Sequence, residues 1–105
     1  MEPVSEKEVP SVYKRTEDFV SRHIMDSYVL VPVGKMASKI NGMITLDDVA
    51  SELWNLFMKG EQSDDDLVSY IMNEYSIDEA SARLDVNEFL SEAVRNGSLA
   101  KSADN

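Results

Sequence analysis

The chain has 105 residues and no cysteine, and 43% of its residues are hydrophobic. These values predict one globular domain with a modest core, and they exclude disulfide bonds and thiolate metal sites. Twenty acidic residues against ten basic ones give a formal net charge of −10. This charge disfavours nucleic acid as a partner, because the phosphate backbone binds cationic surfaces, so the expected partner is a peptide or another protein.

The N-terminal stretch "MEPVSEKEVPSV" is acidic and is broken by Pro3 and Pro10. It lacks the basic start and the apolar centre of a secretory signal. No apolar run in the sequence approaches the roughly 18 residues that a membrane-spanning helix needs. We therefore expect a cytoplasmic protein without a membrane partner, in which residues 1–16 form a flexible arm and residues 100–105 a frayed tail.

Three strands are predicted before the long helical patterns begin. The runs "FVSRHIM" (Phe19–Met25) and "YVLVPV" (Tyr28–Val33) flank the turn signal Asp26-Ser27, which indicates a hairpin. After the loop "GKMASKIN", the short run Gly42–Thr45 is predicted to form the third strand. This strand carries neither a proline nor an inward charge that would protect an exposed edge from pairing.

Three helices are predicted to follow, each with a start and a stop signal. Thr45 or Asp47 can cap the first helix, and Gly60 ends it; Ser63 caps the second. The third begins within "SIDE" (Ser76–Glu79), which has capping-box spacing, and ends at "NG". The apolar stripes of the three helices are Val49, Leu53, Trp54 and Phe57; Leu67, Ile71, Met72 and Tyr75; and Ala82, Val86, Phe89 and Ala93.

This order predicts an α+β domain, in which a three-stranded antiparallel sheet packs one face against three helices. Apolar residues of the second strand then lack cover on the other face of the sheet, namely Val29, Val31 and Val33. We expect either the N-terminal arm around Val9–Tyr13 or a second copy of the protein to cover them.

No set of residues predicts catalysis or metal binding. His23 is the single histidine, and no serine has a histidine and an acid in supporting context. The run Asp64-Asp65-Asp66 suits the positive end of a helix dipole, and consecutive helical residues do not converge on one ion. Trp54 is assigned to the core rather than to a cofactor platform. We therefore expect a protein that is not an enzyme and holds no cofactor or metal.

Three motifs, in this order, resemble the PqqD-like family, which is named for protein D of pyrroloquinoline quinone synthesis. They are "ITLDDVASELW", where the family usually has Leu-Asn-x-x-Ala before a tryptophan, "EYSIDEASARLDV", and "DVNEFLSEAVRNGSL", where Asp-Val-x-x-Phe-Leu is closed by a glycine. The resemblance covers Phe19 to Leu99 and departs from the family at Asp47, where asparagine is usual. It implies a small winged-helix-like domain over residues 17–99.

The resemblance also implies a function. Members of this family bind the leader peptide of a ribosomally made precursor and present it to a modifying enzyme, often a radical S-adenosylmethionine enzyme. The leader adds itself as an extra strand beside the third strand and lies against the third helix. Main-chain hydrogen bonds then give affinity, and pockets for alternate side chains give selectivity.

Candidate peptide-binding residues follow from this resemblance. The strand set shares one backbone edge and consists of Ile40, Asn41, Gly42, Met43, Ile44 and Thr45. The favoured flank of the third helix offers apolar contact and one cation, and consists of Arg83, Asn87, Leu90 and Val94. The alternative flank is acidic, would suit a basic leader, and consists of Asp85, Glu88 and Glu92.

Two other functions compete with this one. A winged-helix DNA-binding regulator would place the third helix in the major groove, but its span Asp78–Arg95 carries five acidic residues against two arginines. Phosphate would repel such a helix. A structural homodimer is supported by "YVLVPV", because its apolar residues point to both faces of a sheet that has helices for only one.

Overall fold

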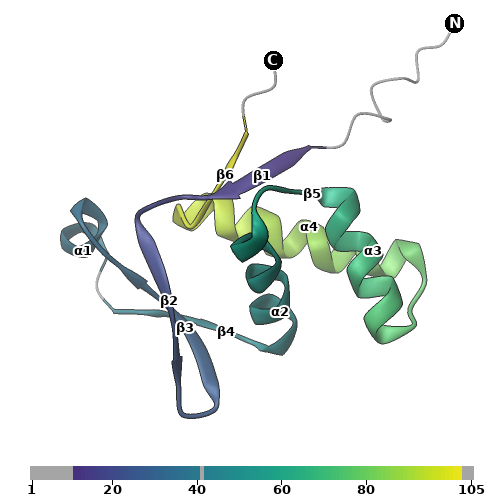
Figure 1. The fold of residues 1–105 in the computed structure, drawn as a ribbon, viewed down its shortest axis with the longest axis horizontal. Coiled ribbons are helices and arrows are strands. Elements are labelled where there is room, and N and C mark those ends of the chain that lie inside the picture. Colours follow the sequence, from purple (N-terminus) through teal and green to yellow (C-terminus); the bar gives the residue numbers. More distant parts are fainter. Residues whose placement is uncertain (1–10, 41, 103–105) are drawn as a thin grey trace, which may run out of the picture.

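The structure is a computed structural model that describes residues 11–40 and 42–102 (Figure 1). It is an α+β fold with two small antiparallel sheets, and the predicted α+β class is confirmed. In chain order the elements are β1 (Val12–Arg15), β2 (Phe19–Ile24), β3 (Ser27–Pro32), α1 (Lys35–Lys39), β4 (Ile44–Leu46), α2 (Asp48–Leu56), the 3₁₀ turn η2 (Phe57–Lys59), β5 (Gln62–Ser63), α3 (Asp64–Tyr75), α4 (Glu79–Asn96) and β6 (Leu99–Lys101).

The predicted three-stranded sheet is the one with strand order β2-β3-β4. Phe19 pairs with Pro32 at one end of the hairpin and Ile24 with Ser27 at the other. Pro32 is the last residue of β3, where a missing donor costs little. Within the described residues β4 pairs only with β3, so β4 lies at the edge of this sheet.

A second sheet, with strand order β5-β1-β6, was not predicted. Residues 12–15, expected in a flexible arm, form its central strand, and residues 100–101, expected in a frayed tail, belong to β6. Strands this short show no periodic pattern, and pairing with distant segments stabilises them. Thr16 strengthens the link, since its hydroxyl donates to the carbonyl of Gly97 at 2.6 Å and its N–H to that of Ser98 at 3.1 Å.

The helix starts agree with the capping signals in part. Of the two candidate caps for α2, Asp47 is the one used: its Oδ1 accepts from the N–H of Ala50 at 2.8 Å. Ser63 caps α3 in a full capping box with Asp66. At α4 the prediction differs from the structure, because Asp78 is the cap, while Ser76 ends α3 in a left-handed conformation with φ 54°.

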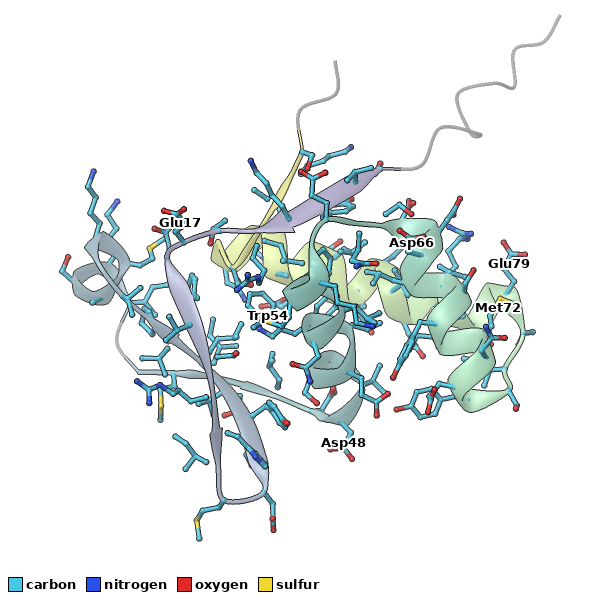
Figure 2. The ribbon with its side chains drawn as sticks, viewed as in Figure 1. Glu17, Asp48, Trp54, Asp66, Met72 and Glu79 are labelled. Carbon is cyan, nitrogen blue, oxygen red and sulfur yellow. The ribbon has the colours of Figure 1, made fainter. Side chains whose placement is uncertain are left out.

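Acidic residues occupy the first turn of all three long helices. Asp48, Asp66 and Glu79 lie in the first turns of α2, α3 and α4 respectively (Figure 2). There they meet the positive end of each helix dipole. The run at the start of α3 is thus explained by helix chemistry. Among the described residues no group of histidine, aspartate and glutamate side chains is placed to hold a metal ion.

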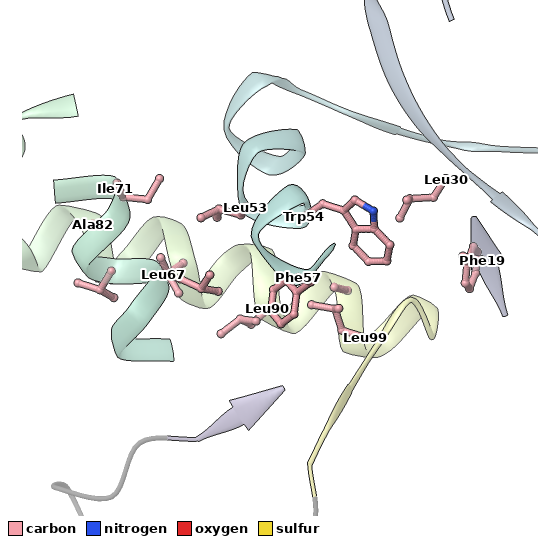
Figure 3. Packing of buried hydrophobic residues seen from close by; sticks show 13 residues of the cluster. Phe19, Leu30, Leu53, Trp54, Phe57, Leu67, Ile71, Ala82, Leu90 and Leu99 are labelled. Carbon is pink, nitrogen blue, oxygen red and sulfur yellow. The ribbon is translucent and has the colours of Figure 1, made fainter. Parts of the chain in front are cut away.

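One hydrophobic core joins the helices to the inner face of the β2-β3-β4 sheet (Figure 3). Trp54 and Phe57 at its centre are each 1% exposed. The helix stripes supply most of the core, although Tyr75 at the end of the second stripe is 40% exposed. The core members are Phe19, Leu30, Leu53, Trp54, Phe57, Leu67, Val68, Ile71, Ala82, Val86, Leu90, Ala93 and Leu99.

The outer face of the β2-β3-β4 sheet is only partly covered. Val29 is 5% exposed between its cross-strand neighbours Arg22 and Thr45, whereas Val31 is half-buried and Val20 is 40% exposed. Of the expected cover, residues 11–13 are described, and Val12 and Tyr13 belong to β1, which pairs with β5 and β6 instead. Residues 9 and 10 lie outside the described residues. No helix of the described chain is long and apolar enough to cross a membrane.

Candidate functional site

A groove of about 470 Å³ lies between β4 and α4, with the start of α2 at its side. Trp54, Leu30 and Ala93 form its apolar floor, and all three are buried. The groove therefore combines one strand wall, one helix wall and a floor that belongs to the hydrophobic core.

The strand wall presents a backbone edge whose orientation follows from the sheet register. The N–H of Val33 donates to the carbonyl of Asp18 beside β2, so by alternation Val29 also directs its backbone groups toward β2. Thr45 is opposite Val29, and in an antiparallel pair opposite residues either bond each other or both point away. The N–H and C=O of Thr45 therefore point to the open edge of β4.

The helix wall is the acidic flank of α4. Asp85, Glu88 and Glu92 line the groove together with the half-buried Phe89. Their spacing of three and four residues puts these side chains on one face of the helix. From the sequence alone, this flank was the alternative rather than the favoured one.

The favoured flank of α4 does not line this groove. Leu90 is 4% exposed and belongs to the core. Arg83 turns toward α3, where its Nη2 lies 3.1 Å from Oδ1 of Asp65, and it also lies 3.1 Å from Oε2 of Glu79, one turn earlier on α4. Hydrogen bonds to these carboxylates, that to Glu79 first, raise the pKa of Arg83. Asn87 and Val94 are exposed elsewhere on the helix.

The remaining candidates on the strand side lie at the approach to β4. Ile44 is half-buried and lines the groove with Thr45. Ile40 is half-buried against the core, whereas Gly42 and Met43 are exposed, Met43 by 56%. Asn41 lies outside the described residues. The structure thus brings the two strand residues Ile44 and Thr45 together with the acidic flank.

The contribution of α2 to the groove was not predicted from the sequence. Asp47, Val49 and Ala50 line the groove, because α2 begins directly after β4. That adjacency was a usable signal: a groove beside β4 must also border the helix that follows it with one intervening residue. The floor gave no such signal, since core residues in a sequence do not reveal which of them lie beneath a groove.

The electrostatics of the groove are one-sided. Its lining includes the carboxylates of Asp47, Asp85, Glu88 and Glu92 and no lysine or arginine. Asp47 caps α2, and Glu92 accepts from Arg95 at 2.6 Å. In the described part of the chain no cation is paired with Asp85 or Glu88. The groove therefore offers an acidic wall, an apolar floor and an open strand edge.

An α+β domain with an open edge strand beside a groove is a class of domain that can accept an added peptide strand. Over residues 27–99 the sequence matches the family described as Coenzyme PQQ synthesis protein D (PqqD), and the chain belongs to this family. The resemblance inferred from the sequence motifs is confirmed.

Two solved structures are similar to this chain. One, described as TbiB1 in complex with the TbiA(beta) leader peptide, has 30% sequence identity and a TM-score of 0.70, and the match covers 87% of this chain and 99% of that one. The other is a lasso peptide synthetase B1 complexed with the leader peptide, with 17% identity and a TM-score of 0.68 over 84% of this chain and 96% of that one. The second likeness shows the fold alone. Among curated proteins, none matches the sequence significantly.

Proposed function

We propose that this protein is a leader-peptide-binding module. A precursor's leader segment adds itself as a strand at the open edge of β4 and covers the groove between β4 and α4. The observation that carries this proposal is the unpaired backbone edge at Thr45 directly beside the groove. The relation to TbiB1, whose structure contains a leader peptide, supports it.

The binding mode follows from the chemistry of the edge. The N–H and C=O of Thr45 supply main-chain hydrogen bonds, and Ile40, Gly42 and Met43 supply the approach along which the added strand continues. The helix contacts are assigned to Asp85, Glu88, Phe89 and Glu92, in place of the flank formed by Arg83, Asn87, Leu90 and Val94. A flexible leader loses conformational entropy on docking, so we expect roughly micromolar affinity.

The module presents the bound precursor to a modifying enzyme and performs no chemistry itself. A radical S-adenosylmethionine enzyme is one class of partner that this role fits. In this arrangement the module binds the leader, and the enzyme acts on other residues of the precursor. The exposed side of α4 and the outer face of the β2-β3-β4 sheet remain free, within the described chain, to meet that partner or a second copy of the protein.

Nuclear magnetic resonance tests this proposal directly. The labelled protein is titrated with synthetic leader regions of candidate precursor peptides. Amide shifts should cluster on β4 and on residues 85–96 of α4, and those of α3 should stay in place. Shifts confined to α3 or to the β5-β1-β6 sheet would refute the assigned groove, and saturable binding of duplex DNA in a parallel titration would favour the regulator instead.

A further inference from the structure

The concentration of carboxylates in the groove does not follow simply from the negative net charge of the protein. Among the described residues the lining contains four carboxylates and no basic side chain. In contrast, Arg83 and Arg95, the two arginines of α4, bind carboxylates at 3.1 Å and 2.6 Å and lie outside this lining. Asp85 and Glu88 thus face the open groove without a cation from the described residues.

An added strand would bring these carboxylates into a drier environment. Removing a carboxylate from water is unfavourable unless a cation or hydrogen-bond donors replace the lost water. A neutral or acidic strand would leave Asp85 and Glu88 uncompensated. A strand with lysine or arginine on the side that points to α4 would pair with them through charge-assisted hydrogen bonds.

A second observation at the floor of the groove also points to a ligand. Trp54 is 1% exposed, and its Nε1 is buried without a hydrogen-bond partner among residues 11–40 and 42–102. The indole nitrogen lies on the side of the ring that faces Leu30, which is also a floor residue (Figure 3). Buried indole N–H groups usually have an acceptor. A carbonyl of a docked peptide is the acceptor that this site lacks.

We propose that the peptide segment recognised by this groove is basic and amphipathic, which deepens and rests on the proposed function. Lysine or arginine side chains point to Asp85 and Glu88 on α4. Apolar side chains of the same segment cover the floor formed by Trp54, Leu30 and Ala93. Because both regions lie in one groove on the inner face of the β2-β3-β4 sheet, the basic and the apolar residues occupy alternate positions, two residues apart, on the same side of the added strand. The floor contact brings the peptide backbone toward Trp54.

A displayed library of random linear peptides tests this preference and requires no identified precursor. The library is selected against the wild-type protein, against Glu88→Lys, and against Glu61→Lys as matched control. Both variants change the net charge equally, and Glu61 is an exposed residue outside the groove lining. Peptides selected by the wild type and by Glu61→Lys should be enriched in lysine and arginine, whereas those selected by Glu88→Lys should lose this enrichment.

Binding of the strongest selected peptide is then measured with Trp54, the single tryptophan of the chain, as reporter. Its indole N–H resonance should move downfield on binding. Glu88→Lys should weaken binding by roughly tenfold or more, the expected size for loss of a charge-assisted hydrogen bond. Glu88→Gln should give a smaller loss in the same direction, and circular dichroism confirms that both variants fold.

The outcomes separate the two proposals. Peptides that shift Thr45 and the indole N–H, but show no excess of lysine or arginine and bind Glu88→Lys equally well, would overturn the basic preference and leave the proposed function standing. If no selected peptide and no leader region shifts Thr45, the groove is not a peptide site and both proposals fail.

Discussion

Tyr70 connects α3 to α2 through one hydrogen bond, in which its hydroxyl donates to Oε1 of Glu52 at 3.1 Å. Burial, and then the bond to Glu52 and the nearby negative charge, raise the pKa of Tyr70 to about 12. A raised pKa favours the protonated form in the folded state. The associated stability is therefore fully present below pH 10 and is lost as the pH rises from 10 toward 12.

We expect Tyr70→Phe to lower the free energy of unfolding by about 0.5–1.5 kcal/mol at neutral pH, the usual value of one hydrogen bond. The variant should also lose less stability than the wild type between pH 10 and 12, since the group that titrates is gone. Urea unfolding at a series of pH values measures both effects. Parallel stability curves for the two proteins above pH 10 would show that Tyr70 does not carry this pH dependence.

Gly97 follows α4 with φ 90°, a backbone conformation that favours glycine. A Cβ at this position would lie 3.2 Å from Cε of Met36 and 3.8 Å from Cε1 of Phe19. Gly97→Ala should therefore cost about 1–2 kcal/mol for the backbone conformation, plus the displacement of Met36.

Gly60→Ala is the matched control for this prediction. Gly60 also has a positive φ, of 137°, but a Cβ there would meet nothing within 4 Å. Both variants should have a lower melting temperature than the wild type. Adding Met36→Ala should recover part of the lost stability in the Gly97→Ala background but not in the Gly60→Ala background. Equal recovery in both backgrounds would mean that the contact with Met36 is not the cause.

At the residue scale, the capping residue could be predicted where the sequence offered only one candidate for that position. Ser63 is the predicted cap of α3, and the structure adds the reciprocal bond from its N–H to Asp66. At the start of α4 the capping-box spacing had pointed to Ser76, but the cap is Asp78, whose carboxylate accepts from both the N–H and the hydroxyl of Ser81. The hydrogen bonds to Ser81 lower the pKa of Asp78. They are local, but the sequence does not show at which residue the chain turns into the helix, and that residue becomes the cap.

At the scale of elements, β4 offers a sharp test of the binding mode. Its N–H groups alternate, and that of Thr45 points away from β3 to the open edge. Thr45→Pro removes this donor from an exposed residue, and Ile44 before it is already extended, as proline requires. The variant should keep its fold and lose at least tenfold in affinity for the leader region.

Two companion variants make that result specific. Thr45→Ala removes the side chain but keeps the N–H, so it should bind nearly as well as the wild type. Ile44→Pro removes a donor directed to β3, so it should unfold or melt much earlier. Full binding by a folded Thr45→Pro protein would show that the peptide does not pair at this edge.

Elements were predictable where an amphipathic pattern persists over many residues, as in α2, α3 and α4. The missed elements each have fewer than six residues. The short helix α1 (Lys35–Lys39) has no buried residue, and β5 has two residues. Pairing with β1 determines the conformation of β5, whereas α1 is a single short turn held by local bonds such as that from the N–H of Ile40 to the carbonyl of Met36, too short to show a periodic pattern.

For the whole molecule, the structure has a groove between the predicted strand and the predicted helix, and this groove is lined by the acidic flank of that helix rather than by the flank favoured from the sequence. The two flanks of α4 differ by a rotation about the helix axis. In the observed rotation Leu90 packs in the core and Arg83 bonds Asp65 of α3. Leucine beside a cation had suggested a binding surface, whereas here the leucine fills the core and the cation joins α4 to α3.

The net charge of −10 leads to a final prediction for the whole molecule, in which salt has opposite effects on folding and on binding. Repulsion among excess acidic groups destabilises the compact state, and salt screens it as the Debye length falls from about 30 Å at 0.01 M to about 8 Å at 0.15 M. The exposed ion pairs of Arg83 and Arg95 oppose this trend only weakly, because each contributes little in water. We therefore expect the melting temperature to rise with sodium chloride, by roughly 4–8 °C for each 1 kcal/mol gained in a domain of this size.

Binding of a basic peptide in the groove should respond in the reverse direction and weaken at higher salt, since there salt screens an attraction. Glu61→Lys reduces the net charge and should shrink the gain in melting temperature while preserving the salt dependence of binding. Glu88→Lys should make binding clearly less dependent on salt, since three carboxylates of the groove remain. A melting temperature that falls with salt would mean that local ion pairs outweigh the net charge, and salt-independent binding of a basic peptide would place its cations away from the acidic wall.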